Sequence, residues 1–263
     1  MQKNFEQWPL GKIPSELQRI ELEQVKDLGY KYNDARELVN IFEETIANFC
    51  GSKYAVSIDN CTDAIMLCLE YIKLCDGLFF ARNGITIPSR VYPSVPMEIC
   101  KSGFKINFEN KDWSGIYRLD PFRLYDAAVR FTKNMYIKDS FMCLSFQLKK
   151  RLCIGKGGMI LLDNKDMYDW LIKARYQGRD LTVSQWDDEY SMLGWNAYMT
   201  PEDAARGLII FHYLIKQNPS GLFSDTANQD NYADMSQKKI FQPYIVPNLR
   251  ETMDIFKNEK TGN

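Results

Sequence analysis

The sequence has few of the residues from which several common kinds of active site are built. Among its 263 residues there is a single histidine, His212, which argues against a histidine-rich metal site and against a Ser-His-Asp triad. The seven cysteines are an odd number and none forms a Cys-x-x-Cys pair, so their pattern indicates neither a zinc site nor a disulfide framework. We therefore expect free thiols, no metal site and a reducing, cytoplasmic location.

Excess charge and long apolar runs are also lacking. The formal net charge is -1, which argues against a surface that attracts nucleic acid as a whole. The N-terminus has no apolar core of the signal-peptide kind, and no stretch is long enough to span a bilayer. With 45% hydrophobic and 25% charged residues, the chain has the composition of an ordinary globular protein. We expect neither nucleic acid nor a membrane as a partner.

What the sequence does contain is an alternation of helix and strand patterns. Apolar positions at helical spacing predict a helix that begins at Asn33 or Asp34 and ends at Gly51, where a glycine suits the helix end. Further helices are predicted at 60–77, 94–102, 165–176 and 200–217. Short apolar runs predict strands at 53–58, 84–88, 104–109, 123–128, 141–146 and 158–163. The alternation indicates an open α/β sheet that binds ligands at the carboxyl ends of its strands.

Reactive and polar side chains follow several of these strands. Lys150 comes after the run at 141–146, and a partly desolvated amine there can form a Schiff base with an aldehyde. Asp126 ends another run, where a carboxylate can keep a pyridine nitrogen protonated. Thr62 opens a helix, and its hydroxyl and the free N–H groups suit a phosphate. Taken singly, Lys150 is better explained as a rim lysine and Thr62 as an N-cap, and Asp126 is nearly as well explained as a structural cap.

Other residues near these positions extend the pattern. Asn60 and Cys61 belong to the same turn as Thr62, and Ser145 adds a hydroxyl close to Lys150. Tyr92 lies in a loop after a strand, where an aromatic ring can stack on a flat cofactor, although a core position is an equally good interpretation.

These parts resemble the pyridoxal phosphate site of the DegT/DnrJ/EryC1/StrS family of sugar aminotransferases, a branch of the fold type I enzymes. The resemblance runs from about residue 33 to residue 216. "YDAA" (125–128) matches the family's Asp-Ala-Ala, and "LSFQLKKRLCIGKGGMI" (144–160) is similar to its Ser-Phe-His-x-x-Lys block with a Gly-Glu-Gly-Gly turn. In that register Lys150, and not Lys149, is the Schiff-base lysine.

The resemblance implies a domain organisation and a cofactor. We expect a helical segment at 1–32, a large domain with a mainly parallel, helix-flanked sheet at 33–216, and a polar loop with a short remnant of a truncated small domain at 217–263. The implied cofactor is pyridoxal 5'-phosphate, held as an aldimine on Lys150. The residues implied to contact it are Asp126, Thr62, Cys61, Asn60, Ser145, Tyr92 and, from the neighbouring subunit of a homodimer, Asn196.

The implied reaction is transfer of an amino group from a glutamate-like donor to a nucleotide-linked keto sugar. The sequence departs from the family pattern at five places. They are Asn60-Cys61-Thr62 for Ser-Gly-Thr, Val129 for a polar residue, Gln147 for histidine, Lys156 for glutamate and Tyr198 for arginine. Two alternatives therefore stay open: a degenerate or non-transaminating pyridoxal phosphate protein, and a non-enzymatic dimer or scaffold subunit.

Overall fold

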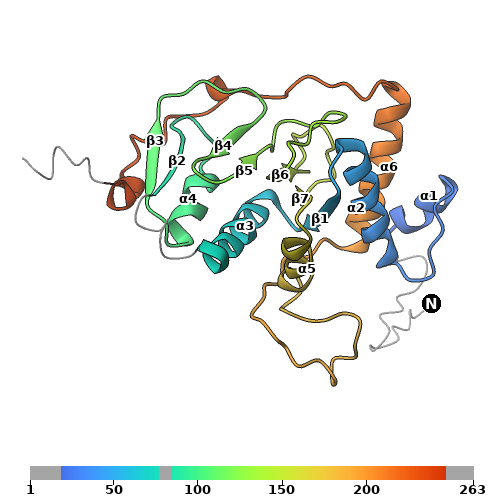
Figure 1. Ribbon diagram of the computed structural model, residues 1–263. Coiled ribbons are helices and arrows are strands. Elements are labelled where there is room, and N and C mark those ends of the chain that lie inside the picture. Colours follow the sequence, from blue (N-terminus) through green and yellow to red (C-terminus); the bar gives the residue numbers. More distant parts are fainter. Residues whose placement is uncertain (1–18, 77–83, 247–263) are drawn as a thin grey trace, which may run out of the picture.

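A sheet between two layers of helices forms the centre of the computed structural model, which describes residues 19–76 and 84–246 (Figure 1). Five strands pair in the order β1-β7-β6-β5-β4. Beyond β4, the parallel pair of β2 and β3 continues the sheet through a bridge between Thr86 and Asp120. The strands are β1 (Tyr54–Ile58), β2 (Ile85–Pro88), β3 (Ile106–Glu109), β4 (Tyr117–Leu119), β5 (Leu124–Asp126), β6 (Phe141–Ser145) and β7 (Gly158–Leu162).

The two faces of the sheet are covered by different helices. One face packs on α2 (Glu37–Cys50) and α6 (Pro201–Gln217), with α1 (Glu21–Asp27) against α6. The other packs on α3 (Cys61–Asp76), α4 (Ser94–Lys101) and α5 (Lys165–Ala174). Alternate residues of β7 serve the two cores: Met159 and Leu161 belong to the first, Ile160 and Leu162 to the second. This confirms the prediction that the strand is buried on both faces.

The ends of α2 follow the sequence signals closely. Gly51 has φ 84° and caps the carboxyl end, as predicted. The helix itself begins at Glu37, a few residues after the predicted start. Asp34 lies in the turn before the helix, where its carboxylate accepts from the Arg36 N–H at 2.8 Å and the Glu37 carboxylate accepts from the Asp34 N–H at 3.2 Å.

The α/β class is confirmed, but the sheet is mixed where the sequence analysis predicts a mainly parallel one. The pairs β5–β6 and β2–β3 are parallel, whereas β1–β7, β6–β7 and β4–β5 are antiparallel. Residues 120–123 alone join β4 to β5, and a parallel pair needs a much longer crossover. The short connection therefore makes β4 and β5 a hairpin, in which Arg118 Nε donates to the Phe122 carbonyl at 2.6 Å.

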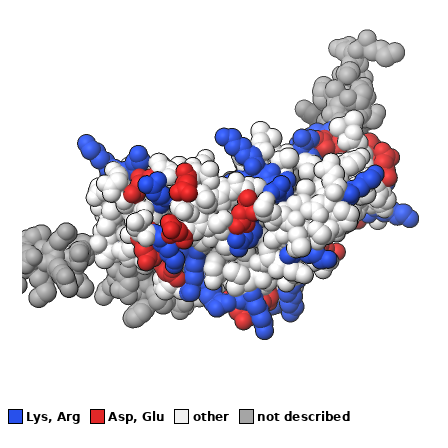
Figure 2. Space-filling view, turned by 90° about the horizontal axis from the view of Figure 1, so that it is seen from above, with Lys and Arg blue, Asp and Glu red and all other residues white. Residues whose placement is uncertain are grey.

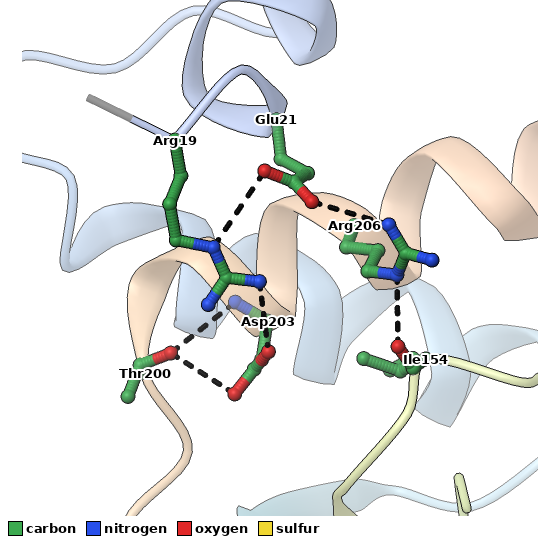
Figure 3. Close-up of polar contacts among 6 residues, drawn as sticks. All are labelled: Arg19, Glu21, Ile154, Thr200, Asp203 and Arg206. Atoms are coloured by element: carbon green, nitrogen blue, oxygen red, sulfur yellow. Dashed lines mark hydrogen bonds and ion pairs between the residues drawn. The ribbon is translucent and has the colours of Figure 1, made fainter. Parts of the chain in front are cut away.

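Charged side chains attach α1 to α6 (Figure 3). Glu21 lies between Arg19 at 3.6 Å and Arg206 at 3.2 Å. Arg19 also pairs with Asp203 at 3.4 Å, and Arg206 Nε donates to the Ile154 carbonyl at 2.8 Å. The arginines are partly exposed, so these pairs add little stability individually. Together they link the first described helix to α6.

After α6 the chain returns across the molecule to β2 and β3 (Figure 1). We call residues 218–246 the return segment; it includes the short 3₁₀ helices η2 (Gln229–Asn231) and η3 (Lys239–Tyr244). Asp225 in this segment binds Arg130 through two hydrogen bonds of 2.8 and 2.7 Å. Farther along, the Met235 N–H donates to the Ser89 carbonyl at 2.7 Å. The segment is thus fixed to the loops after β5 and β2.

Basic and acidic side chains are interspersed on the face of the molecule that Figure 2 shows.

Within the two described ranges, every helix is too short or too polar to cross a bilayer.

Candidate active site

The strand directions bring the predicted site residues to one edge of the sheet. β5 and β6 are parallel; β1 runs the same way as β6 because both are antiparallel to β7. β2 runs the same way as β5 because β4 opposes both. The carboxyl ends of β1, β2, β5 and β6 therefore share an edge, which is where open α/β sheets bind ligands. The residues there are Asn60, Cys61, Thr62, Tyr92, Asp126, Ser145 and Lys150.

Asp126 is a buried carboxylate with two hydrogen-bond donors. Its side chain is 5% exposed; Oδ2 accepts from the Tyr117 hydroxyl at 2.6 Å and Oδ1 from the Ala128 N–H at 2.8 Å. Burial raises the pKa of Asp126, while these two hydrogen bonds and the positive charge of Lys150 oppose the rise. Each carboxylate oxygen keeps an acceptor position for a further donor.

Lys150 lies in a loop that the end of β6 and the start of β7 hold closed. The Phe146 N–H donates to the Gly157 carbonyl at 2.9 Å, and the Gly155 N–H donates to the Phe146 carbonyl at 3.1 Å. Gly155 and Gly157 have φ of 131° and 142°, values that glycine adopts without strain. Within the loop Lys149 is exposed and Lys150 is half-buried. The two lysines therefore differ in environment, and the positive charge of Lys150 lowers the pKa of Asp126.

The turn between β1 and α3 holds a helix cap, and a hydroxyl group at the start of α3 meets one at the start of α4. Asn60 Oδ1 accepts from the Asp63 N–H at 2.9 Å, so Asn60 is the N-cap of α3. The Thr62 hydroxyl lies 3.0 Å from the Ser94 hydroxyl, which belongs to the first turn of α4. Burial, followed by the charge of Asp126, raises the pKa of the Cys61 thiol. Two helix starts thus meet at this edge, a favourable place for a phosphate.

One feature of this turn opposes an anion. Burial and the neighbouring Asp59 raise the pKa of Asp63 to about 6. A carboxylate that is ionised above that pH repels a phosphate, and Lys156, at 3.0 Å from Asp59, offsets part of the charge.

Aromatic rings surround the Asp126 side of the edge. Tyr92 is 58% exposed, and its ring meets the edge of the Tyr232 ring at 6.4 Å. Tyr232, from the return segment, stacks on Trp113 at 5.5 Å, and Trp113 packs on Tyr117 at 4.8 Å. Burial, followed by the charge of Asp126, raises the pKa of Tyr232. Trp113 and Tyr117 also line a cavity of about 240 Å³.

Asn196 lines a hollow of its own beside Asp59, the residue before Asn60. It is exposed and lines a hollow of about 320 Å³ with Asp59, Lys156 and Thr200. Among the described residues, the lining of this hollow includes none of Lys150, Asp126 and Thr62. Its role toward a neighbouring subunit therefore stays a prediction.

Three residues that the sequence analysis does not single out belong to the site. Ser94 shares a hydrogen bond with Thr62, Tyr117 donates to Asp126, and Tyr232 meets the Tyr92 ring, with its pKa raised partly by the charge of Asp126. Their partners come from other elements, so no local pattern marks them.

The residues at this edge fit pyridoxal phosphate in kind. A buried carboxylate with acceptor capacity suits the protonated ring nitrogen, a half-buried lysine suits the aldehyde, and hydroxyls at two helix starts suit the phosphate.

Comparison with known proteins gives a consistent result. Residues 19–108 and 134–221 match the model of the DegT/DnrJ/EryC1/StrS aminotransferase family. An uncharacterized protein of Methanocaldococcus jannaschii is 23% identical over 64% of this chain and 55% of its own length. AtS13 from Actinomadura melliaura has a TM-score of 0.61 at 18% identity, over 74% of this chain and 64% of its own. A GDP-4-keto-6-deoxymannose-3-dehydratase solved with bound GDP-perosamine has a TM-score of 0.57 at 15% identity, over 74% of this chain and 64% of its own.

These comparisons confirm the predicted family and the fold type I class. The chain spans less than two thirds of the length of each of these relatives. The unmatched residues between the two family segments contain the β4–β5 hairpin and Asp126. The role of Asp126 at this site therefore stays a prediction, which its burial and its place at the carboxyl edge of the sheet support.

Proposed function

Because the chain belongs to the DegT/DnrJ/EryC1/StrS aminotransferase family, we propose that it is a pyridoxal 5'-phosphate-dependent aminotransferase acting on a nucleotide-linked keto sugar with a glutamate-like donor. The main support is the half-buried Lys150, whose charge reaches the buried Asp126 at the carboxyl edge of the sheet. The GDP-sugar bound to one structural relative supports a nucleotide sugar as the substrate class.

Five side chains would hold the cofactor. Asp126 would accept a hydrogen bond from the protonated ring nitrogen, Lys150 would bind the aldehyde carbon, and Thr62 with the free N–H groups of α3 would bind the phosphate. Ser145 would bind beside Thr62, and Tyr92 would cover the ring. When bound, pyridoxal phosphate supplies an electron sink that stabilises negative charge beside an amino group.

Two groups of the chain would handle the protons. Asp126, as a carboxylate, keeps a proton on the ring nitrogen, because separating opposite charges in a buried site is costly. Lys150 Nζ would take the proton from Cα of the amino donor and deliver it to the aldehyde carbon of the cofactor, acting as a general base and then a general acid.

The proposed assembly is a homodimer in the cytoplasm, with residues 33–216 as the cofactor-binding domain. A twofold axis would use Asn196 twice, once for the phosphate of each neighbouring subunit. The odd number of cysteines without a Cys-x-x-Cys pair is the sequence feature behind the proposed reducing compartment. Sedimentation of the cofactor-loaded protein tests the assembly, and a monomer with full occupancy would contradict it.

A half-reaction tests the proposed activity. The cofactor-loaded protein is mixed with glutamate in the absence of a keto sugar, and 2-oxoglutarate is quantified by mass spectrometry. We expect an amount stoichiometric with bound cofactor, none from Lys150→Ala, and a normal amount from the matched control Lys149→Ala. Bound cofactor without 2-oxoglutarate would refute glutamate transamination and favour a non-transaminating protein.

A further inference from the structure

We infer that Tyr117 is a positioning residue that holds the Asp126 carboxylate toward the ring nitrogen of the cofactor. The inference rests on the proposed function, because it concerns the same cofactor site. Tyr117 lies in the hairpin between the two segments that match the family model, so the contact is built by a part of the chain that the match does not include.

The hydrogen bond between the two side chains is short and shielded from solvent. Tyr117 Oη donates to Asp126 Oδ2 at 2.6 Å, and the two side chains are 7% and 5% exposed. The Ala128 N–H occupies Oδ1 at 2.8 Å. With one donor on each oxygen, the plane of the carboxylate is fixed, and one acceptor position on each oxygen is left for a ligand.

The register of the hairpin sets this contact. Tyr117 and Asp126 are directly opposite each other in the antiparallel pair β4–β5, so their side chains leave the sheet on the same face. A slip of one residue would turn Tyr117 to the opposite face and leave the buried carboxylate without its phenol. The short connection at 120–123 is therefore part of the site.

The Tyr117 ring is held by its neighbours. Trp113 packs on it at 4.8 Å with an interplanar angle of 57°, and Trp113 Nε1 donates to the Arg90 carbonyl at 2.9 Å. Arg90 lies in the loop that carries Tyr92. The Tyr232 ring stacks on the Trp113 ring, with the two ring centroids 5.5 Å apart. One chain of contacts thus joins the ring-stacking candidate, the indole, the phenol and the carboxylate.

A purely structural role, in which Tyr117 only satisfies a buried carboxylate, makes a different prediction. If the role is only structural, Tyr117→Phe weakens binding equally for ligands with and without a ring nitrogen. If Tyr117 positions Asp126, Tyr117→Phe weakens binding only of the ligand that has this nitrogen. Pyridoxal phosphate and its deaza analogue, which has a CH group at that place, therefore distinguish the two roles.

The experiment measures dissociation constants by titrating cofactor-free protein with each compound. For Tyr117→Phe we expect binding of pyridoxal phosphate to weaken about 10-fold, the effect of losing one hydrogen bond to a charged group, while the deaza analogue changes less than about twofold. Tyr32→Phe is the matched control, since it removes a phenol that donates to the Leu22 carbonyl at 2.7 Å on α1, and it should leave both constants unchanged.

Each other outcome contradicts a distinct statement. If Tyr117→Phe binds pyridoxal phosphate like wild type, or loses equally for both compounds, the positioning role is wrong and the proposed function stands. If the wild-type protein binds neither compound, the positioning role and the proposed function are both wrong. Should Tyr117→Phe fail to fold, Trp113→Phe, which keeps the phenol but removes the indole beside it, should show a smaller loss of the same nitrogen-dependent kind, and a nitrogen-independent loss would refute the inference.

Discussion

Replacing Gly158 by alanine should move β7 away from the turn that begins α3. A Cβ at this position would lie 2.5 Å from the carbonyl carbon of Asn60, 2.6 Å from its oxygen and 2.6 Å from the nitrogen of Cys61. All three are backbone atoms, so no side-chain rotation relieves the contact. Either the strand or the turn has to shift, and Thr62 shifts with the turn.

The magnitude follows from two opposing effects. Overpacking of this kind costs about 1 to 3 kcal/mol, while replacing glycine by alanine restricts the unfolded chain and returns about 0.4 to 1 kcal/mol. We expect the free energy of unfolding to fall by about 1 to 2 kcal/mol. For a protein of this size that corresponds to a melting temperature lower by about 2 to 8 °C.

Thermal unfolding of the cofactor-free protein and titration with pyridoxal phosphate check the two consequences. Gly103→Ala is the matched control. Gly103 has φ 84°, and a methyl group added there would meet no other part of the described chain within 4 Å, so alanine strains the backbone without meeting a neighbour. The control should lose stability but keep its affinity for pyridoxal phosphate, whereas Gly158→Ala should lose both.

An unchanged melting temperature for Gly158→Ala would refute the close approach of β7 to the α3 turn. An unchanged affinity together with a lowered melting temperature would show that the turn does not bind the phosphate.

Three further changes test the packing around the site. Glu43→Ala leaves the buried Arg175 guanidinium without its carboxylate and should lower the free energy of unfolding by about 3 to 5 kcal/mol in urea titrations; a loss below about 1 kcal/mol would refute the buried pair. Because the pKa of Asp63 is raised from 3.8 to about 6 on folding, stability should fall as the pH rises from about 4 to 6, by about 1 kcal/mol after allowance for partial exposure. Asp63→Asn should remove that slope, and urea titrations that keep it would contradict the assignment. Asp225→Ala breaks both hydrogen bonds to Arg130 and should make the return segment more sensitive to proteolysis, with unchanged cleavage as the contrary result.

The helices and central strands could be predicted because their signals are local. The apolar positions of α2 recur at helical spacing and end at a glycine with positive φ, and the apolar run of β7 is long enough to show burial on both faces. β4 has only Tyr117, Arg118 and Leu119, too few residues for a period to appear. Its antiparallel pairing depends on the length of the connection to β5, which hydrophobic periodicity does not record.

The same distinction applies to the site. Lys150 and Asp126 could be expected near each other because both follow strands whose carboxyl ends share an edge. The hydrogen bond from Tyr117 could not be predicted, since it depends on the register of the hairpin, and neither could the approach of Tyr232, which depends on the path of the return segment. Whether these residues hold a cofactor stays a prediction.

Identifying the lysine that binds pyridoxal phosphate tests the central claim most directly. The protein is incubated with the cofactor, reduced with borohydride, digested and mapped by mass spectrometry. The half-buried position of Lys150 and the effect of its charge on the pKa of Asp126 predict a label on Lys150, lost in Lys150→Ala and kept in Lys149→Ala. A label on Lys149 or another lysine, or no specific label, would contradict the account.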